Sequence, residues 1–476
     1  MTNPIFVSPY PAPDKSSTQS SFFGWLAILM LVLASVACYF AAPSLLRLMF
    51  PFASLAVGLF LYFKYPCLYL SFTWWQWFLI ALIRRLIDYR VGLDQQKLIL
   101  LSPFLVTLIT GITFIQYLPR TLRTQGGLPF IISIFTVLYG IAIGLVNYDK
   151  VIVLRTALDW LAPVLFGFHI FVNWRKYPEF RQNIEKVFLW CVLITSIYGI
   201  FQFIVAPEWD KLWLIGEKFT TAGSPEPFKL RIWGTMHSPG PFANALMAGL
   251  LLLLNQQHPL GIVSSSVGYL SFLLTVVRSS WGGWVVGLLT LLTNLKPKLQ
   301  MRLFITIIVL MLCVVPLTMI EPFSKIISDR LETVTNLDKD QSYRDRSESY
   351  DRKLSLALSS PLGNGIGGTW IIDKDGKFVS IVLDSGILDT FFAIGWFGAV
   401  FYLGAIFIIL YDIFTTPVIR SDAFASASRS VSLAIFSQMI LGSAMLGLSG
   451  MILWGFLAHT VAAKKYYNQQ RSSGAL

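Results

Sequence analysis

The sequence contains few charged residues for its length. Asp, Glu, Lys and Arg make up 13% of its 476 residues, whereas 55% are apolar, and the mean hydropathy is +0.65. A soluble protein of this size needs far more polar surface to cover its core, so the composition excludes that class. The apolar residues occur in blocks of about 15 to 25, the length with which a helix crosses ~30 Å of hydrocarbon. An outer-membrane barrel would show short alternating segments instead.

Cysteine is also scarce. The four cysteines, Cys38, Cys67, Cys191 and Cys313, all lie inside apolar blocks, and none forms a CxxC pair or a cluster with histidine. Buried thiols of this kind act as small packing residues. The sequence therefore predicts neither a disulfide framework nor a zinc site, and we expect no metal or other cofactor.

Most of the charges that are present are basic, with 37 Lys and Arg against 25 Asp and Glu. Much of this excess lies in short loops beside apolar blocks, as the positive-inside rule expects for a membrane protein. We therefore expect membrane lipids, and no nucleic acid, as partners. Residues 1–22 are polar and rich in Pro and Ser, so we predict a disordered cytoplasmic tail rather than a cleavable signal.

Fourteen apolar blocks are predicted to span the membrane. They lie near residues 24–42, 45–63, 66–83, 98–118, 128–146, 151–173, 187–206, 241–255, 260–277, 281–294, 302–320, 387–411, 430–447 and 449–463. The blocks at 241–255, 281–294 and 449–463 are short for a full crossing, and a re-entrant pair would leave twelve spans. The expected fold is an all-α polytopic membrane protein with 12 to 14 transmembrane helices.

The expected organisation follows from these blocks. Transmembrane helices 1 to 11 occupy residues 23–320, and the C-terminal transmembrane helices occupy residues 387–463. Between them lies one long extracytoplasmic loop, residues 321–386, and a cytoplasmic tail follows at 464–476.

Basic residues in the short loops orient the spans. One side carries Arg120, Arg123, Arg175, Lys176, Arg181, Lys186, Lys296, Lys298, Arg302, Lys464 and Lys465. That side is predicted to be cytoplasmic, which places segments 207–240 and 321–386 outside. Three basic residues do not fit this orientation, namely Arg84, Arg85 and Arg90. If every early block crosses the membrane, they lie on the outer side. Either an early block does not cross, or this basic cluster has a role at the outer face.

The long loop differs in composition from the rest of the chain. From Ser342 to Leu358 its pattern fits an amphipathic helix, whose apolar stripe is Tyr343, Tyr350, Leu354 and Leu358. A short hairpin with a turn around Asp375-Gly376 is predicted to follow. Because ordered loops of this length usually have a function, we expect it to roof an outward-facing cavity; the alternative is a passive solvated loop.

Two further patterns in the loop point to backbone geometry. The stretch GNGIGG lacks the Lys-Ser/Thr of a phosphate loop, so its glycines are expected to allow close backbone approach. Two Asp-Lys-Asp triplets, at 338–340 and 373–375, are interpreted as turns rather than metal sites.

Charged residues also lie at the outer ends of predicted spans, namely Arg231, Arg278 and Asp384. Arginine binds phosphate through two parallel charged hydrogen bonds, and a carboxylate beside such a site suits general-base work on a sugar hydroxyl. The alternatives are interfacial arginines and, for Asp384, a helix N-cap. His237, the one histidine in an outer segment, lies either in a turn or at the site.

Three stretches resemble the O-antigen ligase and O-antigen polymerase superfamily of bacterial membrane glycosyltransferases. They are RIWGTMHSPGPFANALMAGL, VVRSSWGGWVVGLL, and DQSYRDRSESYDRKLSLALSSPLGNGIGG followed by DSGILDTFFAIGWFG. Each motif is loose alone, but their order and spacing over about residues 230–410 make the joint match fairly specific.

The resemblance implies a metal-independent, inverting transfer at the outer face of the bacterial cytoplasmic membrane. The donor would be a glycan on undecaprenyl pyrophosphate, the acceptor a glycan or lipid-linked sugar, and other envelope polysaccharide-assembly proteins would be further partners. The pyrophosphate would be bound by Arg231, Arg278 and Arg346, with Arg344 or Arg352 as less certain choices.

One position departs from the pattern of the superfamily. Its ligases often carry a His-Asn pair where this chain has Asp384 and Ser385, so the resemblance favours a polymerase or another exopolysaccharide-assembly member. Asp384 and Arg278 are the candidate catalytic residues, and Arg84 and Arg85 remain further candidates. The alternatives are a transporter or flippase for lipid-linked sugars or another anionic solute, and a non-catalytic scaffold.

Overall fold

The computed structural model describes residues 21–94, 96–123, 126–217, 222–254, 258–292, 301, 354–372, 378–380 and 385–473. Several predicted features lie outside these residues. They are the span at 302–320, the greater part of the amphipathic helix, both Asp-Lys-Asp triplets, Arg344, Arg346, Arg352 and Asp384.

Eight helical segments of the described residues are long and apolar enough to cross a membrane. They are α2 (Phe22–Ala41), α3 (Pro43–Lys64), α4 (Pro66–Val91), Leu98–Thr121, α7 (Leu128–Asn147), α8 (Lys150–Val172), Trp174–Val205 and α17 (Gly386–Thr415). The segment Leu98–Thr121 comprises η1 (Leu98–Leu100), α5 (Leu101–Leu108) and α6 (Gly111–Thr121), and Trp174–Val205 comprises η2 (Trp174–Lys176) and α9 (Tyr177–Val205). The prediction of an all-α polytopic membrane protein is confirmed.

The remaining described helices complete the bundle. They are α10 (Glu208–Gly216), α11 (Pro239–Leu253), α12 (Pro259–Leu274), α13 (Arg278–Leu292), α18 (Val418–Ser421), α19 (Ala423–Gln438) and α20 (Gly447–Ser472). At ~1.5 Å per residue, α11 and α13 are roughly 22 Å long, less than the ~30 Å of a full crossing. The choice between twelve and fourteen spans therefore stays open.

One of the last two predicted spans was wrong in its boundaries. The sequence predicted 430–447, whereas α19 covers Ala423–Gln438. The span predicted at 449–463 lies within α20, which continues to Ser472. The first half of α19 is rich in serine, which lowers its hydropathy, yet Ser428, Ser430 and Ser432 are buried. Small residues allow helices to pack closely in membranes, so burial rather than hydropathy sets these boundaries.

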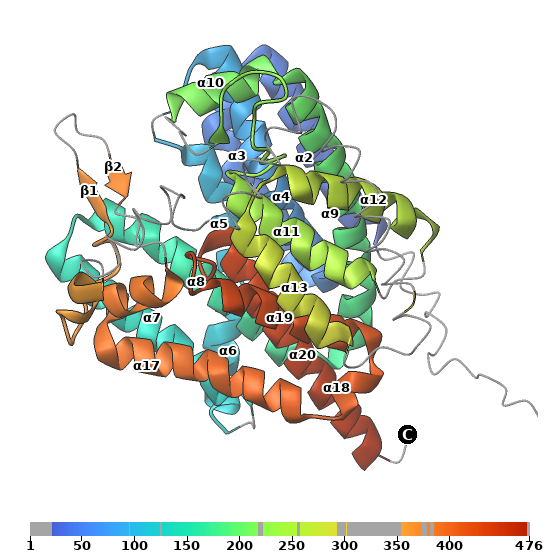
Figure 1. Ribbon diagram of the computed structural model, residues 1–476, viewed down its shortest axis with the longest axis vertical. Helices are drawn as coiled ribbons and strands as arrows, with labels where there is room; N and C mark the ends of the chain where they lie inside the picture. Colours follow the sequence, from blue (N-terminus) through green and yellow to red (C-terminus); the bar gives the residue numbers. More distant parts are fainter. Residues whose placement is uncertain are drawn as a thin grey trace, which may run out of the picture.

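The most extensive contact between two helices of the described residues is that of α8 with α20. A Cβ at Gly167 of α8 would lie 2.8 Å from the carbonyl oxygen of Trp454 in α20, so the two backbones touch. At the periphery, α2 exposes large apolar side chains such as Phe22, Met30 and Phe40, as expected for a helix that faces lipid. The helix α10 lies at one end of the long axis, and the chain ends at the other (Figure 1).

The glycine-rich segment inserts between α7 and α17. The backbone N–H groups of Asn364 and Gly365 donate to carbonyls of α17, and that of Ile366 donates to the Gly140 carbonyl of α7 at 2.9 Å. Gly365 has a φ of +94°, and a Cβ there would lie 2.5 Å from the backbone nitrogen of Gly144. As predicted, the glycines allow close backbone approach, and these N–H groups are already used within the protein.

A two-stranded hairpin follows this segment. Strand β1 (Trp370–Ile372) pairs antiparallel with β2 (Phe378–Ser380), with Trp370 opposite Ser380. The predicted turn between the strands, at residues 375–376, lies outside the described residues. The hairpin stands at the edge of the molecule beside α7 (Figure 1).

Candidate functional site

A cavity of about 420 Å³ lies where α4, α5, α8 and the starts of α11 and α20 meet. Its lining is mostly apolar and includes Trp77, Phe104, Ile152, Met236, Leu446 and Leu448. Its charged and titratable lining residues are Lys97, Arg155, Asp159 and His237. A mostly apolar pocket with a few convergent polar groups is the usual form of a ligand site. We therefore take this cavity as the candidate functional site.

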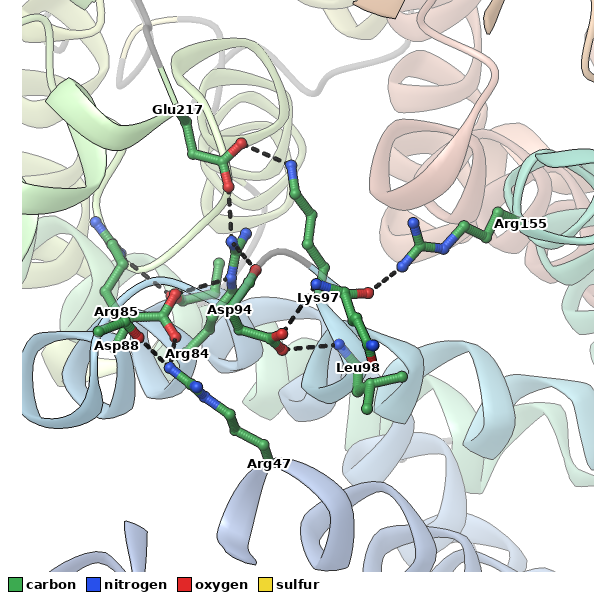
Figure 2. A network of polar contacts seen from close by, with 12 residues as sticks. Arg47, Arg84, Arg85, Asp88, Asp94, Lys97, Leu98, Arg155 and Glu217 are labelled. Atoms are coloured by element: carbon green, nitrogen blue, oxygen red, sulfur yellow. Dashed lines mark hydrogen bonds and ion pairs between the residues drawn. The ribbon is translucent and has the colours of Figure 1, made fainter. Parts of the chain in front are cut away.

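Asp159 and Arg155 come from the same face of α8, one helical turn apart. The carboxylate of Asp159 points toward the start of α20, where a Cβ at Gly447 would lie 3.1 Å from its Oδ1 atom. The guanidinium of Arg155 reaches in another direction and donates to the carbonyl of Gln96, in the connection between α4 and η1 (Figure 2).

His237 lies on the segment that leads into α11, and its ring packs edge-to-face on Trp213 at 5.2 Å between centroids. Burial, together with the positive charges of Arg84 and Lys97, lowers the pKa of His237 to about 4. The imidazole is therefore neutral at neutral pH. The structure places His237 in a bend that forms part of the cavity wall, and whether it belongs to the predicted site of Arg231, Arg278 and Asp384 stays a prediction.

Beside the cavity, Arg84 belongs to a network of charges that links α4 to α10 (Figure 2). Its guanidinium lies 3.1 Å from Asp88 and 2.6 Å from Glu217, and Lys97 contacts Glu217 from the cavity side at 2.6 Å. Burial alone would raise the pKa of Glu217, but the hydrogen bonds and charges of Lys97 and Arg84 outweigh it and lower that pKa. Lys97 thus connects the network to the cavity.

Arg85 is completely buried and pairs with the equally buried Asp210 of α10 at 2.6 Å. It also donates to the Gly234 carbonyl, and Gln202 and Tyr198 donate to the second oxygen of Asp210. Every buried charge in this cluster therefore has a partner. The cluster fixes α10 and the segment before α11 onto the end of α4, and so holds one wall of the cavity.

This cluster bears on the early basic residues. Helices α2, α3 and α4 are all long and apolar enough to cross a membrane. The end of α4 lies beside α10, as the Arg85–Asp210 contact shows. Arg84 and Arg85 do not line the cavity described here, and their partners are carboxylates of the protein. Within the part of the chain that the structure describes, these two arginines position helices around the site.

The structure places Arg231 against the turn between α12 and α13. Its guanidinium donates to the carbonyls of Thr275 at 3.3 Å and Val276 at 2.9 Å. Arg278 opens α13 two residues later, so the two predicted arginines belong to one corner of the bundle. Neither lines the cavity.

The start of α17 packs on the segment that precedes α20. Ser385 is the N-cap, with its hydroxyl accepting from the Leu388 N–H, so the cap role considered for Asp384 belongs to its neighbour. The N–H of Gly386 donates to the Gly442 carbonyl at 3.0 Å. The chain then continues from residue 442 to the cavity wall at residues 446–448.

Sequence reasoning missed Lys97, Arg155 and Asp159. A signal for two of them was present, because Arg155 and Asp159 lie inside the predicted span at 151–173, where charges are rare and usually functional. Lys97 had no such signal, since its place depends on the fold of the α4–η1 connection.

Two searches bear on identity and chemistry. No protein-family model and no curated protein sequence matches the chain. Within the described ranges, no three or more His, Cys, Asp or Glu side chains gather in a way that could hold a metal ion.

Proposed function

We propose that the protein is an integral membrane glycosyltransferase that polymerises or transfers a glycan linked to undecaprenyl pyrophosphate. It would act at the outer face of the bacterial cytoplasmic membrane. The proposal is supported by the ordered series of motifs over residues 230–410, which resembles that superfamily. The observation that carries it is that the first of these motifs supplies Met236, His237 and Pro241 to the wall of the cavity.

The chemical character of the cavity supports a lipid-linked sugar as substrate. An apolar lining that includes Trp77 and Phe104 suits an isoprenoid chain or the face of a sugar ring. The few polar groups on the same wall suit the headgroup of an amphipathic molecule. A soluble, fully polar substrate would leave most of this lining without a complementary partner.

In the proposed reaction, Arg278 and Arg231 hold the pyrophosphate together with Arg346 and with Arg344 or Arg352. Asp384 takes the proton of the acceptor hydroxyl, whose oxygen bonds to the anomeric carbon of the donor. The bond from that carbon to the pyrophosphate breaks, and its electron pair leaves with the lipid pyrophosphate. The arginines stabilise the charge that develops there, and attack from the opposite side inverts the anomeric configuration.

A strain that lacks the protein, complemented with variants, tests this function. Arg278→Ala and Asp384→Ala should each abolish polymer formation while the protein remains in the membrane at normal abundance. Lys229→Ala, a change at an exposed ion pair, should leave the polymer unchanged. Full-length polymer with both site variants would contradict the proposal.

The lipid-linked product that accumulates in the deletion strain refines the assignment. Single repeat units on the lipid would indicate a polymerase, whereas full chains would indicate a ligase. A purified protein that moves lipid-linked sugars across vesicles without changing glycan length would instead indicate the transporter or flippase alternative.

A further inference from the structure

Arg155 and Asp159 carry opposite charges at a spacing that normally brings such side chains together, yet they do not pair. Elsewhere in the chain the same spacing gives ion pairs, with Arg84–Asp88 at 3.1 Å and Arg181–Glu185 at 3.3 Å. On α8 the guanidinium turns to the Gln96 carbonyl, and the carboxylate turns to Gly447. We call Arg155 and Asp159 the split pair.

Within the part of the chain that the structure describes, neither member of the split pair has a charged partner. Asp159 also has no hydrogen-bond donor there, and Arg155 has only a neutral carbonyl. Both line a mostly apolar cavity inside a helix bundle. Charges in such surroundings are costly unless a partner or ligand satisfies them.

The missing partners define the chemistry of a ligand. Arg155 requires an anionic group, for which phosphate is the best geometric match to a guanidinium. A hydrogen-bond donor would satisfy the Asp159 carboxyl group, and a sugar hydroxyl is a neutral donor of this kind. Lys97 also lines the cavity, but its ammonium is paired with Glu217. The volume of about 420 Å³ lies within the ~300–1,000 Å³ of small-molecule sites.

We propose that the split pair binds one phosphorylated sugar headgroup, with Arg155 on the phosphate and Asp159 accepting from a hydroxyl of the sugar. This inference rests on the proposed function for the lipid-linked nature of the ligand. It assigns the headgroup to the cavity between α4, α8 and α20, away from the Arg231–Arg278 corner. A molecule with two such headgroup sites can hold a donor and an acceptor at the same time.

Matched probes separate the contribution of the phosphate to binding from that of the sugar. The full-length protein in nanodiscs is titrated with farnesyl pyrophosphate and with farnesyl pyrophosphoryl glucose, galactose and N-acetylglucosamine. We expect at least one sugar probe to bind about tenfold tighter than the sugar-free probe, as one hydrogen bond to a charged group allows. Asp159→Asn should remove this advantage and leave the affinity for farnesyl pyrophosphate within about twofold. Arg155→Gln should weaken all probes about equally, and Arg155→Lys should restore only part of the affinity, because an ammonium lacks the paired donors of a guanidinium.

Two changes on the same helix serve as controls. Asp149→Asn replaces the N-cap of α8 by an equally good cap, and Lys150→Gln removes an exposed positive charge. Both should leave every affinity unchanged. Equal binding of all probes by the native protein, or a sugar advantage that survives Asp159→Asn, would overturn the inference. Sugar-dependent binding in a protein that neither extends nor transfers a glycan would instead contradict the proposed function alone.

Discussion

The Arg85–Asp210 pair supports the wall of the cavity although neither residue lines it. Both side chains are fully buried, and each has additional hydrogen bonds. Removing one member leaves a buried charge without compensation, which typically costs ~3–5 kcal/mol. We therefore expect Arg85→Gln and Asp210→Asn each to lower the unfolding midpoint of the purified protein by several degrees, followed by tryptophan fluorescence.

The exposed Lys229–Glu226 pair provides the control for this prediction. Its side chains are 60% and 57% exposed, and such pairs contribute little to stability. Glu226→Gln should leave the midpoint unchanged. An Asp210→Asn protein that unfolds at the same temperature as this control would show that the buried pair does not fix α10 to α4.

His237 and Glu217 predict how stability depends on pH. The pKa of His237 is about 4 in the folded protein, against an ordinary value of 6.5, and the pKa of Glu217 is also lowered. The unfolded chain therefore binds protons first as the pH falls. Stability should decrease from about pH 6.5 toward 4 through His237, by at most ~1.4 kcal/mol per pH unit, with the contribution of Glu217 lost below about 4.5.

Equilibrium stability measured across this range in native protein and variants tests the assignment. His237→Gln should flatten the profile between about pH 6.5 and 4.5, and Glu217→Gln should flatten its lower part. A His237→Gln profile that keeps the native slope above pH 4.5 would assign the effect to other groups.

At the residue scale, the sequence singled out His237 because it is the one histidine in an outer segment, and the structure places it at the cavity rather than with Arg231 or Arg278. The partners of Arg84 and Arg85 were not predictable, because Glu217 and Asp210 lie more than a hundred residues away in the chain. Composition and spacing carry local information, whereas long-range pairing is a property of the fold.

Among the elements, the packing of α7 against α17 depends on a few glycines. Gly365 has a left-handed backbone and no room for a side chain, since a Cβ would lie 2.5 Å from the Gly144 backbone nitrogen. Gly365→Ala must therefore displace the segment, and we expect a markedly lower unfolding midpoint.

Gly404→Ala is the control, because it lies in helical α17 with nothing within 4 Å of an added Cβ. There alanine should be neutral or slightly stabilising, by up to ~1 kcal/mol. Equal midpoints in the two variants would contradict the tight insertion.

The elements themselves were predictable wherever a helix faces lipid. Hydropathy located α2, α3 and α7 within a few residues, because lipid-facing helices must be apolar along their whole length. It failed for α19, which is covered by other helices and so tolerates serines and the buried Arg429. Hydropathy predicts a helix well where its side chains face lipid, whereas the side chains of α19 face other helices.

On the scale of the whole molecule, two groups of charges gather at opposite ends. The cavity, α10 and the end of α4 lie together, as the contacts of Arg84 and Arg85 with α10 show. At the other ends of their helices, Arg181 of α9 lies 3.2 Å from Asp422, and Lys464 of α20 lies 2.5 Å from Asp412. The loops that the positive-inside rule assigned to one side therefore do meet in the fold. The arrangement supports the predicted sidedness of these helices relative to one another.

The absolute orientation can be tested by labelling single cysteines. In a background with Cys38, Cys67, Cys191 and Cys313 replaced by serine, Glu226→Cys marks the cavity end and Gln469→Cys marks the far end of α20. Both positions are exposed, so each thiol can react once a reagent reaches it.

Because basic residues concentrate near the α20 end, that end should face the cytoplasm. A membrane-impermeant maleimide applied to intact spheroplasts should then label only the Glu226→Cys protein, and Gln469→Cys should react only after permeabilisation. The reverse pattern would place the cavity in the cytoplasm, where a lipid-linked glycan on the outer leaflet cannot reach it, and would thereby remove the basis for an outward-facing glycosyltransferase.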